Sequence, residues 1–131
     1  MIFLEENVDF HDDIGYRNKE TLASKMKQHI YYKGKYAAMA RAVNDRIFFI
    51  VEGELMVYHN KVNLVKLVRG SYFGEESVLF GKRFLYDIVV ASDVSKIYSL
   101  KKKYFLKIFP KTIVENMKEN FKLKVNNRKN L

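Results

Sequence analysis

The spacing of apolar positions changes twice along this chain of 131 residues and divides it into three parts. Near the N-terminus, apolar residues recur every three or four positions, which predicts an amphipathic helix over residues 21–30 behind a lead-in of residues 1–20. Asn18 is the candidate cap of this helix. The apolar positions that define it are Leu22, Ala23, Met26 and Ile30.

From residue 31 to residue 100 the pattern changes to short β-branched and aromatic runs that are separated by turns, such as Glu52-Gly53. Closely spaced short strands favour an antiparallel roll or barrel over β-α-β units. The predicted fold class is therefore α+β and mainly β. The clearest strands are Ile47–Val51, Glu54–His59, Val62–Val68, Asp87–Ala91 and Lys96–Leu100.

After residue 100 the helical spacing returns in two segments that are separated by Pro110, the only proline of the chain. Proline ends the first segment because it lacks an N–H and restricts the residue before it. The second segment carries an apolar stripe that fits docking of a helix onto the roll. Its members are Ile113, Met117, Phe121 and Val125. We therefore predict a single domain over residues 1–131, with the β-roll at 31–100 and two C-terminal helices in 101–131.

Composition excludes several kinds of chemistry. The chain has no cysteine, so a disulfide framework and thiolate chemistry are excluded. His11, His29 and His59 show no metal-ligand spacing. No apolar run approaches the ~20 residues of a membrane span, and the first residues lack the basic start of a signal peptide. We expect a soluble, cytoplasmic domain, including the cytosolic part of a membrane protein among the alternatives.

The positive charge is concentrated at the C-terminal end. Residues 101–131 contain ten Lys or Arg and two Glu, a net charge of +8 out of +9 for the whole chain. Such a basic segment fits contact with anionic lipid, nucleic acid or an acidic partner. A solvated helix face explains the same residues, because lysine is a good helix former.

The stretch GSYFGEESVLFGKRFLYDIVVA, residues 70–91, carries the candidate chemistry. Gly74 lacks a Cβ and leaves N–H groups that can face an anion. Glu75 offers two oxygens to a ribose, and the guanidinium of Arg83 can bind a phosphate through paired hydrogen bonds. Together they predict a small pocket for a sugar-phosphate, although a solvent-facing turn and loop would show the same residues. No nucleophile, base and orienting group occur together, so an enzyme is not predicted.

These segments resemble the cyclic nucleotide-binding domain family of ion channels, kinase regulatory subunits and bacterial catabolite-activator proteins. The resemblance runs from about Thr21 to Phe121. It rests on YKGKYAAMARAVNDRIFFIVEGELMVY, on RGSYFGEESVL, which is similar to the start of the family's phosphate-binding cassette, and on KIYSL followed by helix, proline and helix. It implies an eight-stranded, jelly-roll-like β-roll whose last helix is a lid. It also implies that Gly74 and Glu75 contact the ribose and cyclic phosphate, with Glu76 and Ser77 beside them.

The cassette departs from the family pattern at its second half. The family has an arginine followed by small residues, whereas an ungapped alignment here places Phe84 at the arginine position. Arg83 takes that role only if one extra residue follows it in the loop. Phe84 and Leu85 are bulky where a phosphate needs room, and Asp87 would repel it. Lys82, Arg83 and Arg41 together offer an alternative basic pocket.

Two hypotheses follow from the resemblance. In the first, the chain is a regulatory domain that senses cyclic AMP or cyclic GMP, with no other cofactor, and shifts its C-terminal helix when Phe121 caps the purine. It would belong to a larger channel, transporter or kinase regulator, or act with a partner subunit. In the second, it is a degenerate domain that binds no free nucleotide and acts as an interaction or gating module. A DNA-binding regulator is disfavoured because no helix-turn-helix follows the last helix.

Overall fold

Two four-stranded antiparallel sheets form the body of the protein in a computed structural model that describes residues 16–129. Their strand orders are β1-β8-β3-β6 and β2-β7-β4-β5. The predicted eight-stranded antiparallel roll is thereby confirmed. The strands are β1 (Lys27–Tyr32), β2 (Tyr36–Ala38), β3 (Arg46–Glu52), β4 (Leu55–His59), β5 (Val62–Leu67), β6 (Tyr72–Phe73), β7 (Asp87–Val90) and β8 (Val94–Lys101).

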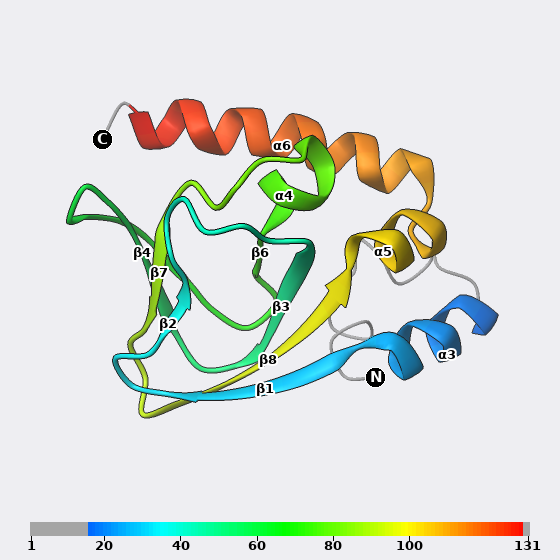
Figure 1. Cartoon of the computed structure of the whole chain (residues 1–131), viewed down its shortest axis with the longest axis horizontal. Helices are drawn as coiled ribbons and strands as arrows, with labels where there is room; N and C mark the ends of the chain where they lie inside the picture. The colour runs from blue at the N-terminus through cyan, green and yellow to red at the C-terminus, as the bar shows by residue number, and fades with distance from the viewer. Residues whose placement is uncertain (1–15, 130–131) are drawn as a thin grey trace.

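Within residues 16–129, four helices cover one end and one side of this roll (Figure 1). The first and third helices lie side by side at one end, and the long last helix starts beside the third and runs across the top of the roll in this view, over the short helix that follows β6. The helices are α3 (Tyr16–Lys25), α4 (Glu75–Phe80), α5 (Lys102–Ile108) and α6 (Lys111–Lys129). Pro110 separates α5 from α6, as predicted.

Strand β3 shows why both faces of its sheet are buried. Its side chains alternate in direction, as those of any strand do. Ile47 and Phe49 join the cluster that packs under the helices, whereas Phe48 and Ile50 face the interior of the roll. This strand therefore divides the core into one cluster beneath the helices and one between the sheets.

The helix-side cluster fixes α6 above the roll. The apolar stripe of α6 is confirmed, because Ile113, Met117 and Phe121 are all buried and Val125 is half-buried. Phe49 stacks on Phe109 with ring centroids 6.1 Å apart, which ties the junction of α5 and α6 to β3. Apolar packing at the start of α6 therefore fixes this end of the helix against the roll.

The helix predicted over residues 21–30 is wrong in its second half. Helix α3 ends at Lys25, and β1 pairs antiparallel with β8 over Lys27 to Tyr32. Leu22 is buried as expected, but Ile30 is exposed on the strand. The local spacing of apolar residues fits a helix or a strand here. The strand forms because its backbone pairs with β8, about seventy residues away.

The remaining predicted strands are confirmed to within one or two residues at their ends. Within 16–129, no helix is both long and apolar enough to cross a membrane. Residues 1–15 and 130–131, and with them His11, lie outside the described residues.

Candidate functional site

The chain turns sharply at Gly74, between β6 and α4. Gly74 has φ of 91°, in the left-handed region that favours glycine. A Cβ at this position would lie 2.6 Å from the carbonyl oxygen of Arg46. The sequence suggested that a ligand approaches Gly74 closely, but in the structure the backbone of β3 makes that approach.

Glu75, the first residue of α4, already has a cationic partner. Its side chain is only 7% exposed, and its Oε2 lies 3.1 Å from Nζ of Lys124 in α6. The same ammonium group lies 4.3 Å from the ring centroid of Tyr72. The carboxylate that was predicted to bind a ribose is therefore paired with the last helix.

Glu76 is a second buried acid in the first turn of α4. Its Oε2 accepts a hydrogen bond of 3.1 Å from the backbone N–H of Leu85. Burial, and then the neighbouring Glu75, raise the pKa of Glu76 above its ordinary value. The buried Ser77 hydroxyl has no hydrogen-bond partner among residues 16–129. These two cassette residues thus face the protein's own interior.

Phe84 and Arg83 point to opposite sides of the loop after α4. Phe84 is 8% exposed and belongs to the core inside the roll, with its ring centroid 6.3 Å from that of Phe48. Arg83 is exposed, and its Nη1 lies 3.4 Å from the carbonyl oxygen of Arg41. The phenylalanine, rather than the arginine, therefore enters the roll.

Backbone hydrogen bonds hold the loop in this orientation. The N–H of Phe84 donates to the carbonyl of Ala42, and the N–H of Arg41 donates to the carbonyl of Phe84. Asp87 accepts a bond of 2.8 Å from the N–H of Ala40. Asp87 therefore stabilises the segment after β2, which explains an acidic residue here without a ligand.

The predicted basic cluster of Lys82, Arg83 and Arg41 is on the surface. All three residues are exposed. Lys82 lines a cavity beside Phe121 and Lys122, while Arg83 reaches the backbone of Arg41. Of the described cavities, none has all three cations in its lining.

Phe121, the predicted purine cap, packs against α4. It is 5% exposed, and its ring centroid lies 5.5 Å from that of Phe80. Toward the end of the same helix, the guanidinium of Arg128 lies 4.6 Å from the ring centroid of Tyr86. Three side chains of α6 thus hold it against the roll: Phe121, Lys124 and Arg128. We call these three contacts the α6 latch.

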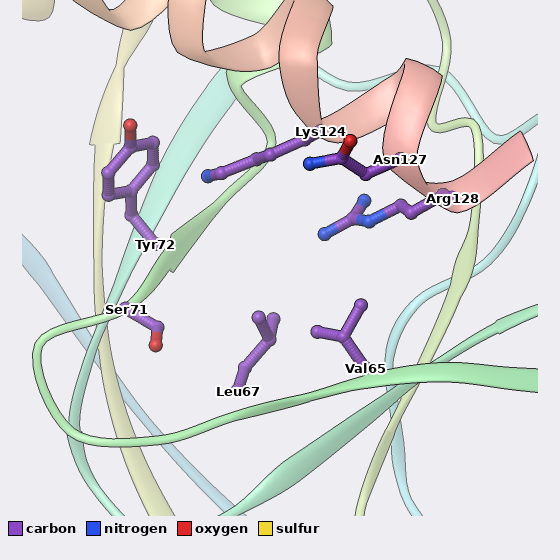
Figure 2. Close-up of a pocket in the computed structure, with 7 residues that line it drawn as sticks. All are labelled: Val65, Leu67, Ser71, Tyr72, Lys124, Asn127 and Arg128. Atoms are coloured by element: carbon purple, nitrogen blue, oxygen red, sulfur yellow. The ribbon is translucent and has the colours of Figure 1, made fainter. Parts of the chain in front are cut away.

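A cavity of about 340 Å³ remains between α6 and the roll. Figure 2 shows side chains from α6 above it, from β5 below it and Tyr72 of β6 at its left side. The residues that line it are Val65, Leu67, Ser71, Tyr72, Lys124, Asn127 and Arg128. Sequence reasoning missed the three α6 residues, whose spacing of three and four positions places them on one helix face.

The described histidines have ordinary structural roles. Nε2 of His29 lies 2.7 Å from the hydroxyl oxygen of Ser99, and burial chiefly lowers the pKa of His29. His59 is exposed at the end of β4. Within residues 16–129, no three His, Asp or Glu side chains are grouped as metal ligands.

Comparison with known proteins gives the family. Residues 28–112 match the family described as cyclic nucleotide-binding domain. The chain belongs to the cyclic nucleotide-binding domain family. The match extends from the second residue of β1 to the start of α6.

Solved structures support the fold. The regulatory domain of Toxoplasma gondii PKA, determined with cAMP, has a TM-score of 0.80 at 16% identity and is matched over 92% of this chain and 47% of its own. The regulatory subunit of a cAMP-independent protein kinase A from Trypanosoma brucei has a TM-score of 0.75 at 17% identity, over 82% of this chain and 39% of its own. This chain spans less than half the length of either protein.

A mutant of the Trypanosoma brucei protein is also similar. It combines a Glu-to-Ala, a Thr-to-Arg and a Val-to-Ala substitution and is described as bound to cAMP in its A site. Its TM-score is 0.76 at 16% identity, over 84% of this chain and 40% of its own.

Proposed function

We propose that this cyclic nucleotide-binding domain is a regulatory module that does not respond to free cyclic AMP or cyclic GMP through its cassette. The burial of Phe84 carries this proposal. At the position where the family resemblance expects a phosphate-binding arginine, an uncharged ring packs beside Phe48. Arg83 would have to reverse its direction to replace it, which would break the two backbone hydrogen bonds that hold the loop.

The α6 latch supports the same proposal. A ribose could bind Glu75 only by displacing the ammonium group of Lys124, 3.1 Å away. Because Glu75 is almost fully buried, losing that partner without a replacement leaves a costly unpaired charge. Lys124 of the chain itself therefore satisfies the carboxylate that a ribose would otherwise bind.

The related structures fit this interpretation. A regulatory subunit of the same fold is described as cAMP-independent, and a mutant of it that gains an arginine is described with bound cAMP. In this chain the arginine of the loop after α4, Arg83, is exposed. We propose that its output is the position of α6, presented to the rest of a larger channel, transporter or kinase regulator, and that it performs no catalysis itself.

Cyclic nucleotide sensing is the second candidate function. The retained Gly74 and Glu75 favour it, because both stand where the family contacts the ribose and cyclic phosphate. In that case the nucleotide would release Lys124 from Glu75 and move α6. The two functions differ in whether a cyclic nucleotide changes the protection of α6.

Hydrogen exchange of the α6 amides tests the proposed function. We expect cyclic AMP and cyclic GMP to leave this exchange unchanged, whereas Lys124→Gln should speed exchange in α6 because the latch loses its ion pair. Lys122→Gln is the matched control, since the ion pair described for Lys122 is with Glu119 on the exposed face of the same helix. Slower exchange on adding either nucleotide would favour the sensor instead.

A further inference from the structure

The cavity beneath α6 has hydrogen-bond donors on one side and apolar groups on the other. Lys124, Asn127 and Arg128 project into it from α6, as Figure 2 shows. Val65 and Leu67 of β5 form the opposite side. None of the residues that line the cavity is acidic. The cavity therefore suits a ligand that has an anionic group at one end and an apolar part at the other.

The donors of α6 are only partly used within the protein. Lys124 has three ammonium hydrogens, of which the contact with Glu75 takes one. The guanidinium of Arg128 contacts the ring of Tyr86 and interacts electrostatically with the buried Glu76, and within residues 16–129 no hydrogen bond of this guanidinium is described. A guanidinium that stacks on a ring keeps its N–H groups, which lie in its own plane, for a ligand.

We propose that this cavity binds a small organic phosphomonoester, represented by a nucleoside 5′-monophosphate, and that Lys124, Asn127 and Arg128 hold its phosphate. A phosphomonoester carries about −1.5 to −2 charges at neutral pH and presents three oxygens, which matches three donors on one helix face. A cyclic phosphodiester carries a single charge and has only two free oxygens. The inference rests on the proposed function, because the phosphate is held by the lid helix and Phe84 stays in the core.

The size of the cavity favours an organic phosphate over a bare ion. Its volume of about 340 Å³ lies within the range of small-molecule sites, roughly 300–1,000 Å³. Inorganic phosphate would leave the half-buried side chain of Val65 in contact with water, whereas Leu67 is already buried. An attached base and sugar would cover Val65 and contribute apolar burial.

Calorimetric titration with adenosine 5′-monophosphate tests the inference. We expect saturable binding that weakens as salt is raised, because ion pairing contributes to it. Adenosine and inorganic phosphate should each bind at least about tenfold more weakly, since each lacks half of the contacts. A monophosphate that does not saturate, or that binds no better than these two probes, would overturn the inference.

Variants of α6 locate the phosphate. Lys124→Gln and Arg128→Gln should each weaken binding about tenfold. Asn127→Asp should abolish it by placing a carboxylate among the donors, and because Asn127 is exposed this change leaves the packing of α6 intact. Lys122→Gln, outside this cavity, should bind as the parent does. Equal binding by all of the α6 variants would contradict the assignment.

The outcomes separate the inference from the proposed function. Binding of cyclic AMP that Arg83→Ala removes would show that the cassette is competent, and the proposed function would fail. Binding of adenosine 5′-monophosphate that only the α6 substitutions remove would support the helix-borne site, whatever the result with cyclic AMP.

Discussion

Replacing Gly74 by alanine is expected to destabilise the protein by about 2 to 5 kcal/mol. The left-handed backbone alone costs a residue with a side chain ~1–2 kcal/mol. The added Cβ would also meet the Arg46 carbonyl oxygen at 2.6 Å, and overpacking of this kind costs a further ~1–3 kcal/mol. Because the neighbour is backbone of β3, it cannot move aside cheaply. Urea denaturation followed by circular dichroism measures the change.

Gly81→Ala is the matched control for this prediction. Gly81 ends α4 with φ of 66°, and nothing lies within 4 Å of a Cβ placed there. It shares the backbone cost without the clash, so we expect a loss of only ~1–2 kcal/mol. If Gly74→Ala costs no more than Gly81→Ala, the space beside Gly74 is available to a ligand after all.

Replacing Phe84 by alanine is expected to cost about 3 kcal/mol, in the range of ~3–5 kcal/mol for a large buried aromatic. The side chain is 8% exposed and fills the roll beside Phe48, so its removal leaves a cavity that the sheets cannot close. Thermal and urea denaturation of the parent and the variant give the difference.

Arg83→Ala provides the comparison, one residue away in the same loop. Arg83 is exposed, and its described contact is with the carbonyl of Arg41 at 3.4 Å, so its removal should change stability by no more than about 0.5 kcal/mol. A large loss for Arg83→Ala together with a small loss for Phe84→Ala would mean that the arginine faces inward. The cassette would then be competent to hold a phosphate.

The regular parts of this fold could be predicted from local sequence. The run Ile47 to Val51 reads as a buried strand because it is apolar at successive positions, and β3 is buried on both faces. The stripe from Ile113 to Phe121 indicates one packed helix face, which the structure confirms. The helix prediction over residues 21–30 was wrong in its second half because pairing with the distant β8 determines β1.

The candidate site depended more on contacts between distant residues. Glu75 and Lys124 are 49 positions apart and meet only because α6 crosses α4. No local pattern predicts such a pair. For Phe84 the sequence was partly informative. An apolar side chain at the position where the family has an arginine already indicated that the pocket differs from the family's. The structure adds that Phe84 belongs to the core.

Isothermal titration of the purified protein with cyclic AMP and cyclic GMP tests the central claim most directly. Moderate salt screens non-specific attraction of the nucleotides to the basic C-terminal segment. With Phe84 in the core and Lys124 on Glu75, we predict no saturable heat with either nucleotide up to millimolar concentration. Saturable binding at or below the micromolar range would contradict the claim and identify the domain as a cyclic nucleotide sensor.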